Sequence, residues 1–400
     1  MREEMIQELT TGIIPFWKGL RDDVYGGYYG FMDYDLQINK EAEKGCILNS
    51  RILWFFSSAY LTLHDRTLLG EAMHAYRFLK DKCVDKQYGG IYWSMTYDGK
   101  VCDATKHTYN QAFAIYALCA YYEAGNDPEA LLLAQRIFDI MEKNCRDEMG
   151  YLEAFGRDFT PESNEKLSEN SVIADRTMNT ALHVLEAYTQ LYRVTKDAAV
   201  KEALMQLLAV IRTKIFNPQK RRLEVFFDKE YQSILDLHSY GHDIEASWLI
   251  DLALETLGEA MFEPADWEEM RRMTGILAEE TYELAFDGAS FANECEAGVV
   301  DETRIWWVQA EAVVGFMNAF QKTADPRYKN AVDALWDFIK ARIIDPRNGS
   351  EWYWEVSADG APAHKPIVEP WKCPYHNGRM CMEMINRLSG NDKKEKSNDT

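Results

Sequence analysis

Short aromatic segments marked by glycine recur along the chain and alternate with pairs of helical stretches. Each aromatic segment shows the apolar alternation of an extended strand, and successive copies start 61 to 72 residues apart. They begin at Gly26, Gly89, Gly150, Arg222, Gly288 and Gly349. The two stretches between successive copies have the 3.6-residue period of a helix. An internal period of this length is typical of stacked helical repeats.

The two helical stretches of each pair differ in how their apolar residues are distributed. The first is apolar nearly all round, as at residues 112–121, whereas the second alternates with charge, as at 336–340. A helix that is apolar on every side is buried, so we predict inner and outer helices that close into a ring. The predicted fold is all-α, an (α/α)6 barrel of twelve helices with short β-hairpins capping one end. The predicted helices span 5–20, 46–63, 68–84, 107–123, 128–144, 175–194, 198–215, 242–257, 265–284, 303–320, 326–343 and 376–388.

The repeat predicts one barrel domain over residues 1–388, followed by a polar tail. Residues 389–400 are charged or polar and include no large apolar side chain, so we expect this tail to be disordered. Eight cysteines occur without any Cys-x-x-Cys pair, which favours reduced, buried thiols.

Composition narrows the range of ligands. Apolar residues make up 47% of the chain and include 11 Trp and 22 Tyr, enough for a large core and an aromatic-lined pocket. The net charge of -21 repels phosphate backbones and anionic lipid, so we expect no nucleic-acid or membrane partner and a neutral ligand. The sequence has neither a signal-peptide pattern nor an apolar run long enough for a membrane span. We expect a cytoplasmic protein that is a monomer or a weak homodimer.

Two of the eight histidines lie where predicted inner helices begin. His242 follows a turn at Gly241, and Glu245 lies on the same helix face three residues later. His376 follows Pro374, which blocks a preceding helix. An imidazole can give or take a proton near neutral pH, so this pair predicts acid/base chemistry. We expect the two helices to lie on opposite sides of the ring.

Other polar and aromatic residues interrupt the inner helices near their N-termini. Residues four apart on a helix share a face, as Asn179 and His183 do, and as Trp307 and Glu311 do. Strips of polar and aromatic side chains from all the inner helices should therefore converge on one pocket. The residues are Arg51, Tyr109, Asn179, His183, Trp307 and Glu311.

Alternative interpretations of these residues stay open. Each histidine could have only a structural role, and His238 with His242 could bind a metal, although the turn at Gly241 points them apart. Glu245 and Glu311 could be structural, or the two carboxylates of an inverting glycoside hydrolase. The chain has no phosphate-binding loop, no Gly-x-Ser-x-Gly and no Cys-rich zinc motif, which argues against nucleotide-driven chemistry and serine hydrolysis. We therefore expect no metal and no cofactor.

Four blocks make the chain resemble the N-acylglucosamine 2-epimerase superfamily. The blocks are HSYGHDIEASW at 238–248, WKCPYHNGRM at 371–380, KHTYNQAF at 106–113 and RIWWVQAEA at 304–312. The resemblance extends from Ile14 to Arg387. It implies an (α/α)6 barrel that acts without a cofactor on the reducing sugar of a β-1,4-linked disaccharide such as cellobiose or lactose.

The same resemblance implies roles for individual residues. His242 and His376 would be the acid/base pair, and His183 would assist ring opening and polarise the carbonyl group. The groups implied to hold the enediolate oxygens are Arg51, Tyr109 and Asn179. Those implied to orient or stack on the sugar are Glu245, Trp248, Trp307, Glu311 and Trp371.

The chemistry of C2 inversion agrees with two histidines. It needs an open-chain aldehyde, removal of the proton beside the carbonyl, and return of a proton to the other face of a planar cis-enediolate. Two bases do this most simply, and fixed donors would stabilise the oxyanion. An aldose–ketose isomerase, a 2-epimerase for N-acylglucosamine or mannose, a glycoside hydrolase and a non-enzymatic sugar-binding protein remain alternatives.

Overall fold

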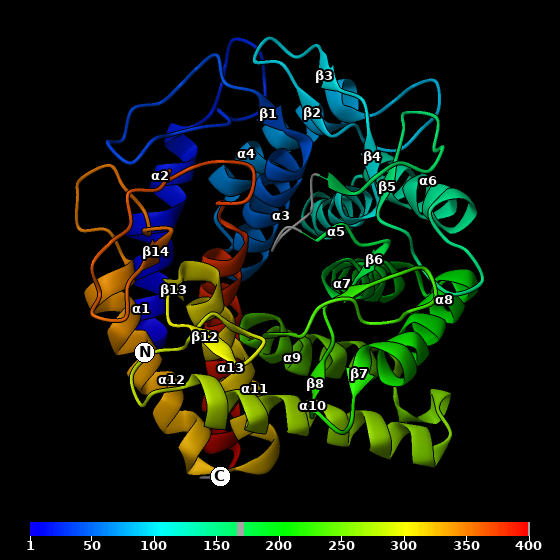
Figure 1. Cartoon of the computed structure of the whole chain (residues 1–400). Helices are drawn as coiled ribbons and strands as arrows, with labels where there is room; N and C mark the ends of the chain where they lie inside the picture. Colours follow the sequence, from blue (N-terminus) through cyan, green and yellow to red (C-terminus); the bar gives the residue numbers. More distant parts are fainter. Residues whose placement is uncertain (166–171, 399–400) are drawn as a thin grey trace.

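The computed structural model describes residues 1–165 and 172–398, which form an inner and an outer ring of helices (Figure 1). Each inner helix contacts the next, and the last contacts the first, so the inner ring is closed. The inner helices are α3 (Cys46–Leu63), α5 (Thr108–Gly125), α7 (Met178–Thr195), α9 (Tyr240–Leu257), α11 (Trp306–Thr323) and α13 (Tyr375–Asn398). The predicted (α/α)6 barrel is confirmed. No helix within the described residues is long and apolar enough to span a membrane.

The outer helices each pack on an inner helix and carry their polar face outward. They are α1 (Arg2–Gln7) with α2 (Ile14–Gly19), α4 (Arg66–Phe78), α6 (Pro128–Asn144), α8 (Ala198–Val210), α10 (Pro264–Ala285) and α12 (Pro326–Phe338). Several are lengthened by π-helical turns, at Glu8–Ile13, Leu79–Cys83, Ile211–Ile215 and Ile339–Ile343. Aspartates cap four outer helices by accepting backbone N–H groups of the first turn, which explains where these helices begin. The caps are Asp65, Asp127, Asp197 and Asp325.

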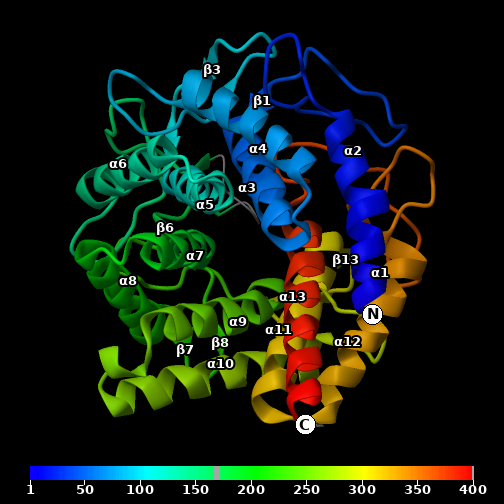
Figure 2. The ribbon, with the colours of Figure 1, turned by 180° about the vertical axis from the view of Figure 1, so that it is seen from behind.

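The first helices close the outer ring against the last inner helix (Figure 2). Arg2 Nε donates to Ser389 Oγ at 2.9 Å, and Trp17 Nε1 donates to Glu351 Oε1 at 3.0 Å. The sequence predicted a disordered tail from residue 389. Helix α13 instead continues past that residue to Asn398. Residues 399–400 lie outside the described part of the chain.

Short antiparallel strands join successive repeats at the end of the barrel where the inner helices begin. In each pair, a strand that leads into an inner helix bonds to a strand that follows the next outer helix. The pairs are β1 (Lys44–Gly45) with β2 (Ser94–Met95), β4 (Lys106–His107) with β5 (Ala154–Phe155), β6 (Arg176–Thr177) with β9 (Phe226–Phe227), β10 (Leu237–Ser239) with β11 (Glu294–Glu296), and β13 (Arg304–Ile305) with β14 (Glu355–Val356). Strands β3 (Val101–Asp103) and β12 (Val299–Asp301) add a third strand to two of these sheets.

The predicted aromatic hairpins form tight antiparallel turns directly after the outer helices. The turn at 216–223 consists of β7 (Phe216–Asn217) and β8 (Arg222–Leu223), and single bridges close equivalent turns such as Val84 with Ile91. An Asp or Asn side chain accepts backbone N–H groups in each turn. These residues are Asp22, Asp85, Asp147, Asn217, Asp287 and Asp345.

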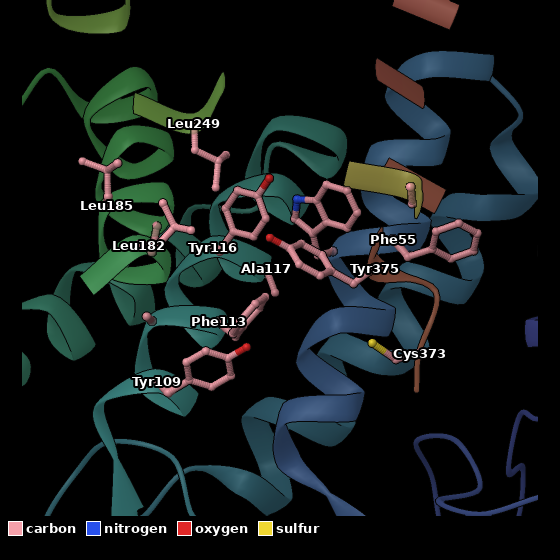
Figure 3. Packing of buried hydrophobic residues seen from close by; sticks show 14 of the residues in the cluster. Phe55, Tyr109, Phe113, Tyr116, Ala117, Leu182, Leu185, Leu249, Cys373 and Tyr375 are labelled. Atoms are coloured by element: carbon pink, nitrogen blue, oxygen red, sulfur yellow. The ribbon is translucent and has the colours of Figure 1, made fainter. Parts of the chain in front are cut away.

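Buried cations two residues before several inner helices bind these turn aspartates. Lys44 Nζ lies 2.6 Å from Asp22 Oδ2, and Arg304 Nη2 lies 2.9 Å from Asp287 Oδ2. These ion pairs fix the entrances of the inner helices that have them. Aromatic side chains fill the space between the inner helices below that entrance, as Figure 3 shows for Phe113, which lies near Tyr109.

Candidate active site

A cavity of about 330 Å³ lies at the end of the barrel where the inner helices begin. Eight of the residues predicted for the site line it, and they come from all six inner helices or the loops that lead into them. These are Arg51, Tyr109, Asn179, His183, His242, Trp307, Trp371 and His376. The prediction of one pocket at one mouth of the barrel agrees with this placement.

The repeat explains why these residues converge. Arg51 and His183 are each the sixth residue of their inner helix, as are Glu245 and Glu311. Equivalent positions of a closed ring lie at the same depth, so side chains far apart in sequence form one layer across the barrel.

Carboxylates hold two of the three pocket imidazoles. His376 Nδ1 lies 2.8 Å from Glu311 Oε1, and His183 Nδ1 lies 3.1 Å from Glu186 Oε2. An ionised carboxylate only accepts hydrogen bonds, so each Nδ1 carries the proton in such a pair. The Nε2 atom of each ring is then free to act as a base toward the pocket.

The third imidazole has a different environment. His242 Nδ1 lies 2.7 Å from the hydroxyl of Ser239, and no carboxylate within the described residues bonds it. Burial, assisted by positive charge at His183, lowers the pKa of His242 to about 3. This imidazole is therefore neutral at neutral pH and able to accept a proton.

Glu311 and His376 form a buried, hydrogen-bonded pair. Burial raises the pKa of Glu311. Burial also lowers the pKa of His376 well below its ordinary value, aided by the positive charge of Arg379 and Arg51. Both shifts disfavour a charge on either partner, so the two groups titrate as a coupled pair. The two imidazoles thus differ in their partners, because His376 is bonded to a carboxyl group and His242 to a hydroxyl group.

Glu245, Trp248 and Glu311, which the resemblance implies to orient or stack on the sugar, lie outside the lining of the cavity formed by the described residues. They lie beneath it, where Trp248 Nε1 donates to Glu311 Oε2 at 3.1 Å and Arg379 Nη2 donates to Glu311 Oε1 at 2.7 Å. Glu311 bonds the pocket residue His376, and all three side chains are buried, so they support the pocket rather than line it.

The expected placement of the two acid/base helices on opposite sides of the ring is wrong. Helices α9 and α13 both contact α11, so one helix separates them. Trp307 of α11 lies between the two imidazoles, with its ring centroid 4.8 Å from that of His242 and 5.3 Å from that of His376. The two bases therefore flank one aromatic ring.

Arg51 and Asn179 present polar atoms to the pocket. Arg51 Nη2 donates to the Tyr109 hydroxyl at 2.6 Å, and Arg51 Nη1 lies 3.7 Å from Cys373 Sγ. Arg51 Nε and Asn179 Oδ1 are buried without a hydrogen-bond partner among the described residues. Buried polar atoms without partners are costly, so these groups are suited to bind the oxygen atoms of a ligand.

The histidine pair considered for a metal points in two directions. His238 Nε2 lies 2.8 Å from Asp243 Oδ2, and the residue lies two positions before α9, where other repeats have a structural cation. His242 instead lines the pocket. His238 is therefore a structural residue.

A second group of possible metal ligands lies beneath the pocket. Glu245, Glu311 and His376 have ligand atoms close to one another. The Nη2 atom of Arg379 bonds both glutamates, at 2.7 Å for Glu311. The guanidinium already supplies the positive charge, and it would repel a divalent cation.

Sequence reasoning missed several residues of the site. Trp306 and Ser239 line the pocket but were not singled out, although Ser239 lies three residues before His242. Glu186 had a signal, because it shares a helix face with His183. The remaining lining residues lie in the short strands and loops at the mouth of the barrel, apart from Thr180 in the first turn of α7, and the sequence analysis did not single them out. They are Thr177, Thr180, Val225, Phe226, Asn293, Glu294, Ile305 and Trp354.

Comparisons with known proteins agree over nearly the full length. The family model described as N-acylglucosamine 2-epimerase (GlcNAc 2-epimerase) matches residues 11–378. The cellobiose 2-epimerase of Eubacterium cellulosolvens is 50% identical, covering 96% of this chain and 98% of that protein. The cellobiose 2-epimerase of Ruminococcus albus is 49% identical, with 97% and 99% covered. The structure of cellobiose 2-epimerase from Bacillus thermoamylovorans has 47% identity and a TM-score of 0.93, with 96% and 99% covered.

Proposed function

Because the chain belongs to the N-acylglucosamine 2-epimerase family, we propose that it inverts C2 of the reducing-end glucose of β-1,4-linked disaccharides. Cellobiose would become glucosyl-mannose, and lactose would become epilactose. The names of its relatives, cellobiose 2-epimerases at 40 to 50% identity, support this substrate class. We further propose that the enzyme works in the cytoplasm, as a monomer or a weak homodimer, without a metal or a cofactor.

One observation carries the proposal: two imidazoles with different hydrogen-bond partners line the same pocket. His242 is neutral beside a hydroxyl, and His376 Nδ1 is bonded to a buried carboxyl group. Epimerisation at C2 requires one group that removes a proton and another that delivers one to the opposite face. A glycoside hydrolase would instead need two carboxyl groups facing the substrate, and Glu245 and Glu311 lie beneath the pocket.

The reaction begins with opening of the sugar ring. His183 Nε2 faces the pocket, so it can accept the proton of the O1 hydroxyl while the ring C–O bond breaks and the ring oxygen takes a proton from solvent water. The product of this step is an aldehyde with an acidic hydrogen at C2. Protonated His183 then polarises the carbonyl oxygen by donating a hydrogen bond.

Proton transfer at C2 uses the two imidazoles in opposite protonation states. His242 is neutral in the empty pocket and can act as a base, and His376 is held by Glu311 through its Nδ1. One imidazole removes the C2 hydrogen and leaves a planar cis-enediolate, and the other protonates C2 from the opposite face. The unpartnered Nε of Arg51 and the Tyr109 hydroxyl beside it bind the oxyanion, and Trp307 and Trp371 offer aromatic faces to the sugar rings.

Isotope labelling tests this mechanism. Cellobiose is incubated with the enzyme in deuterated water, and both epimers are followed by proton NMR from the first turnovers. With two bases, the new epimer carries deuterium at C2 from its first appearance, while recovered substrate carries much less. His242→Asn and His376→Asn should each lose at least the 10²- to 10⁴-fold typical of a general acid or base. Product that keeps its original C2 hydrogen excludes two bases, a ketose product indicates an isomerase, and free glucose indicates a hydrolase.

A further inference from the structure

One guanidinium beneath the pocket joins the carboxylates that hold two of its imidazoles. Arg379, on the second turn of α13, is 2% exposed. Its Nη2 donates to Glu311 Oε1 at 2.7 Å, and its Nη1 donates to Glu186 Oε1. Glu311 bonds His376, and Glu186 bonds His183. Two catalytic rings from different helices are therefore connected through one side chain that does not line the cavity.

Glu186 has partners at both of its oxygens. Arg379 bonds Oε1, while His183 Nδ1 and the Tyr375 hydroxyl both bond Oε2. Arg379 Nη1 also donates to the Tyr375 hydroxyl, which closes the network. Glu186 is buried, and a buried carboxylate with this many donors has one orientation.

The charges within this network are specific. Burial alone would favour a protonated Glu186, but Arg379 and His183 reverse that effect and lower its pKa to about 2. Glu186 is thus a permanent acceptor, which requires His183 to keep its proton on Nδ1. A neutral residue of the same shape would not impose that tautomer.

We propose that Glu186 and Arg379 are positioning residues that fix the tautomer and the orientation of His183 and, through Glu311, of His376. Only the kinetic consequence of this proposal rests on the proposed function. The tautomer itself is a property of the unliganded protein, so it can be measured whether or not cellobiose is the substrate.

A second buried ion pair provides a matched control. Asp251 of α9 is 2% exposed and pairs with Lys322 of α11. Asp251 also accepts hydrogen bonds from Thr274 Oγ1 at 3.0 Å and Asn318 Nδ2 at 2.8 Å. Like Glu186 it is a multiply bonded buried carboxylate on an inner helix, but its partners among the described residues include no imidazole. Asp251→Asn therefore reports the cost of losing a buried charge without disturbing the pocket.

The decisive variant is Glu186→Gln. Its amide oxygen must face Arg379. In the other orientation the NH2 group would point at the guanidinium, and two hydrogen-bond donors would face each other without an acceptor. The NH2 group then faces His183 Nδ1, which must become an acceptor, so the proton moves to Nε2. That tautomer can no longer accept the proton of the O1 hydroxyl.

The experiment combines nitrogen-15 NMR of histidine-labelled protein with steady-state kinetics on cellobiose. We expect the His183 signals to change from the Nδ1–H to the Nε2–H tautomer in Glu186→Gln, with kcat lower by 10- to 100-fold and KM within about threefold. Asp251→Asn should change neither the tautomer nor kcat. If Glu186→Gln does not fold, Tyr375→Phe removes one donor to Glu186 and should broaden or shift the same His183 signals.

Two results would overturn the proposal. One is an unchanged His183 tautomer in folded Glu186→Gln or unchanged His183 signals in Tyr375→Phe. The other is a kcat loss in Asp251→Asn equal to that in Glu186→Gln, since the effect would then be a general response to a lost buried charge. A wild-type protein that does not convert cellobiose would refute the proposed function and leave the NMR result to decide the positioning role.

Discussion

Replacing Glu245 by Gln should change how the stability of the protein depends on pH. Glu245 is fully buried, its Oε1 accepts from Arg379, and its Oε2 has no partner among the described residues. Burial and the negative charge of Glu311 raise the pKa of Glu245 to about 8, against 4.5 for the ordinary side chain. The folded protein therefore keeps a proton between pH 5 and 8 that the unfolded chain has released.

The sign and size of the effect follow from proton linkage. The unfolded state binds fewer protons in this window, so the free energy of unfolding falls as pH rises, by about 1.4 kcal/mol per pH unit for one proton. Over the window the contribution of Glu245 is on the order of 4 kcal/mol. Gln has nearly the same shape and does not titrate. Glu245→Gln should thus match the parent near pH 5 and become progressively more stable than the parent toward pH 8.

Urea denaturation at several pH values between 5 and 8.5 measures this difference directly. Glu186→Gln is the control, because the pKa of Glu186 is about 2 and its carboxyl is ionised in both states across the window. That variant should differ from the parent by a constant offset. If Glu245→Gln also gives a line parallel to the parent, Glu245 is ionised in the folded protein and the assignment of a neutral carboxyl beneath the pocket is wrong.

Three further predictions concern the pocket. Trp371→Ala should keep the fold and raise the KM for cellobiose at least several-fold, because the indole lines the cavity; an unchanged KM would remove Trp371 from the sugar site. Ser239→Ala should lower kcat by about 10- to 100-fold by freeing His242 Nδ1, with full activity in Ser239→Ala showing that the hydroxyl does not orient the ring. Exhaustive chelation should leave turnover unchanged, and loss of turnover that one divalent ion restores would establish a metal requirement.

The fold was predictable because one pattern is repeated six times. Each repeat has the same pattern of one apolar helix, one amphipathic helix and one aromatic turn. An ambiguous pattern in one repeat can therefore be assigned by comparison with the others. The order of helices around the ring also follows from the repeat, yet we placed His242 and His376 on opposite sides. Helices α9 and α13 are two steps apart in a ring of six, which puts α11 between them.

The depth of side chains was harder to predict than their convergence. Helical spacing indicates that Glu245 and Glu311 point inward, but it does not show whether they face the ligand or the layer below it. That distinction depends on Arg379, whose long side chain reaches both glutamates across the barrel. Contacts between residues so far apart in sequence leave no periodic signal.

The two bases differ because their neighbours differ, and this bears on how a nearly symmetrical reaction is catalysed. Inversion at C2 converts one aldose into another, so each base must act as an acid in one direction and as a base in the other. A carboxyl group holds Nδ1 of His376, whereas Ser239 can follow either protonation state of His242, since a hydroxyl both donates and accepts. The adaptable partner at His242 therefore lets that imidazole reverse its role when the other epimer binds.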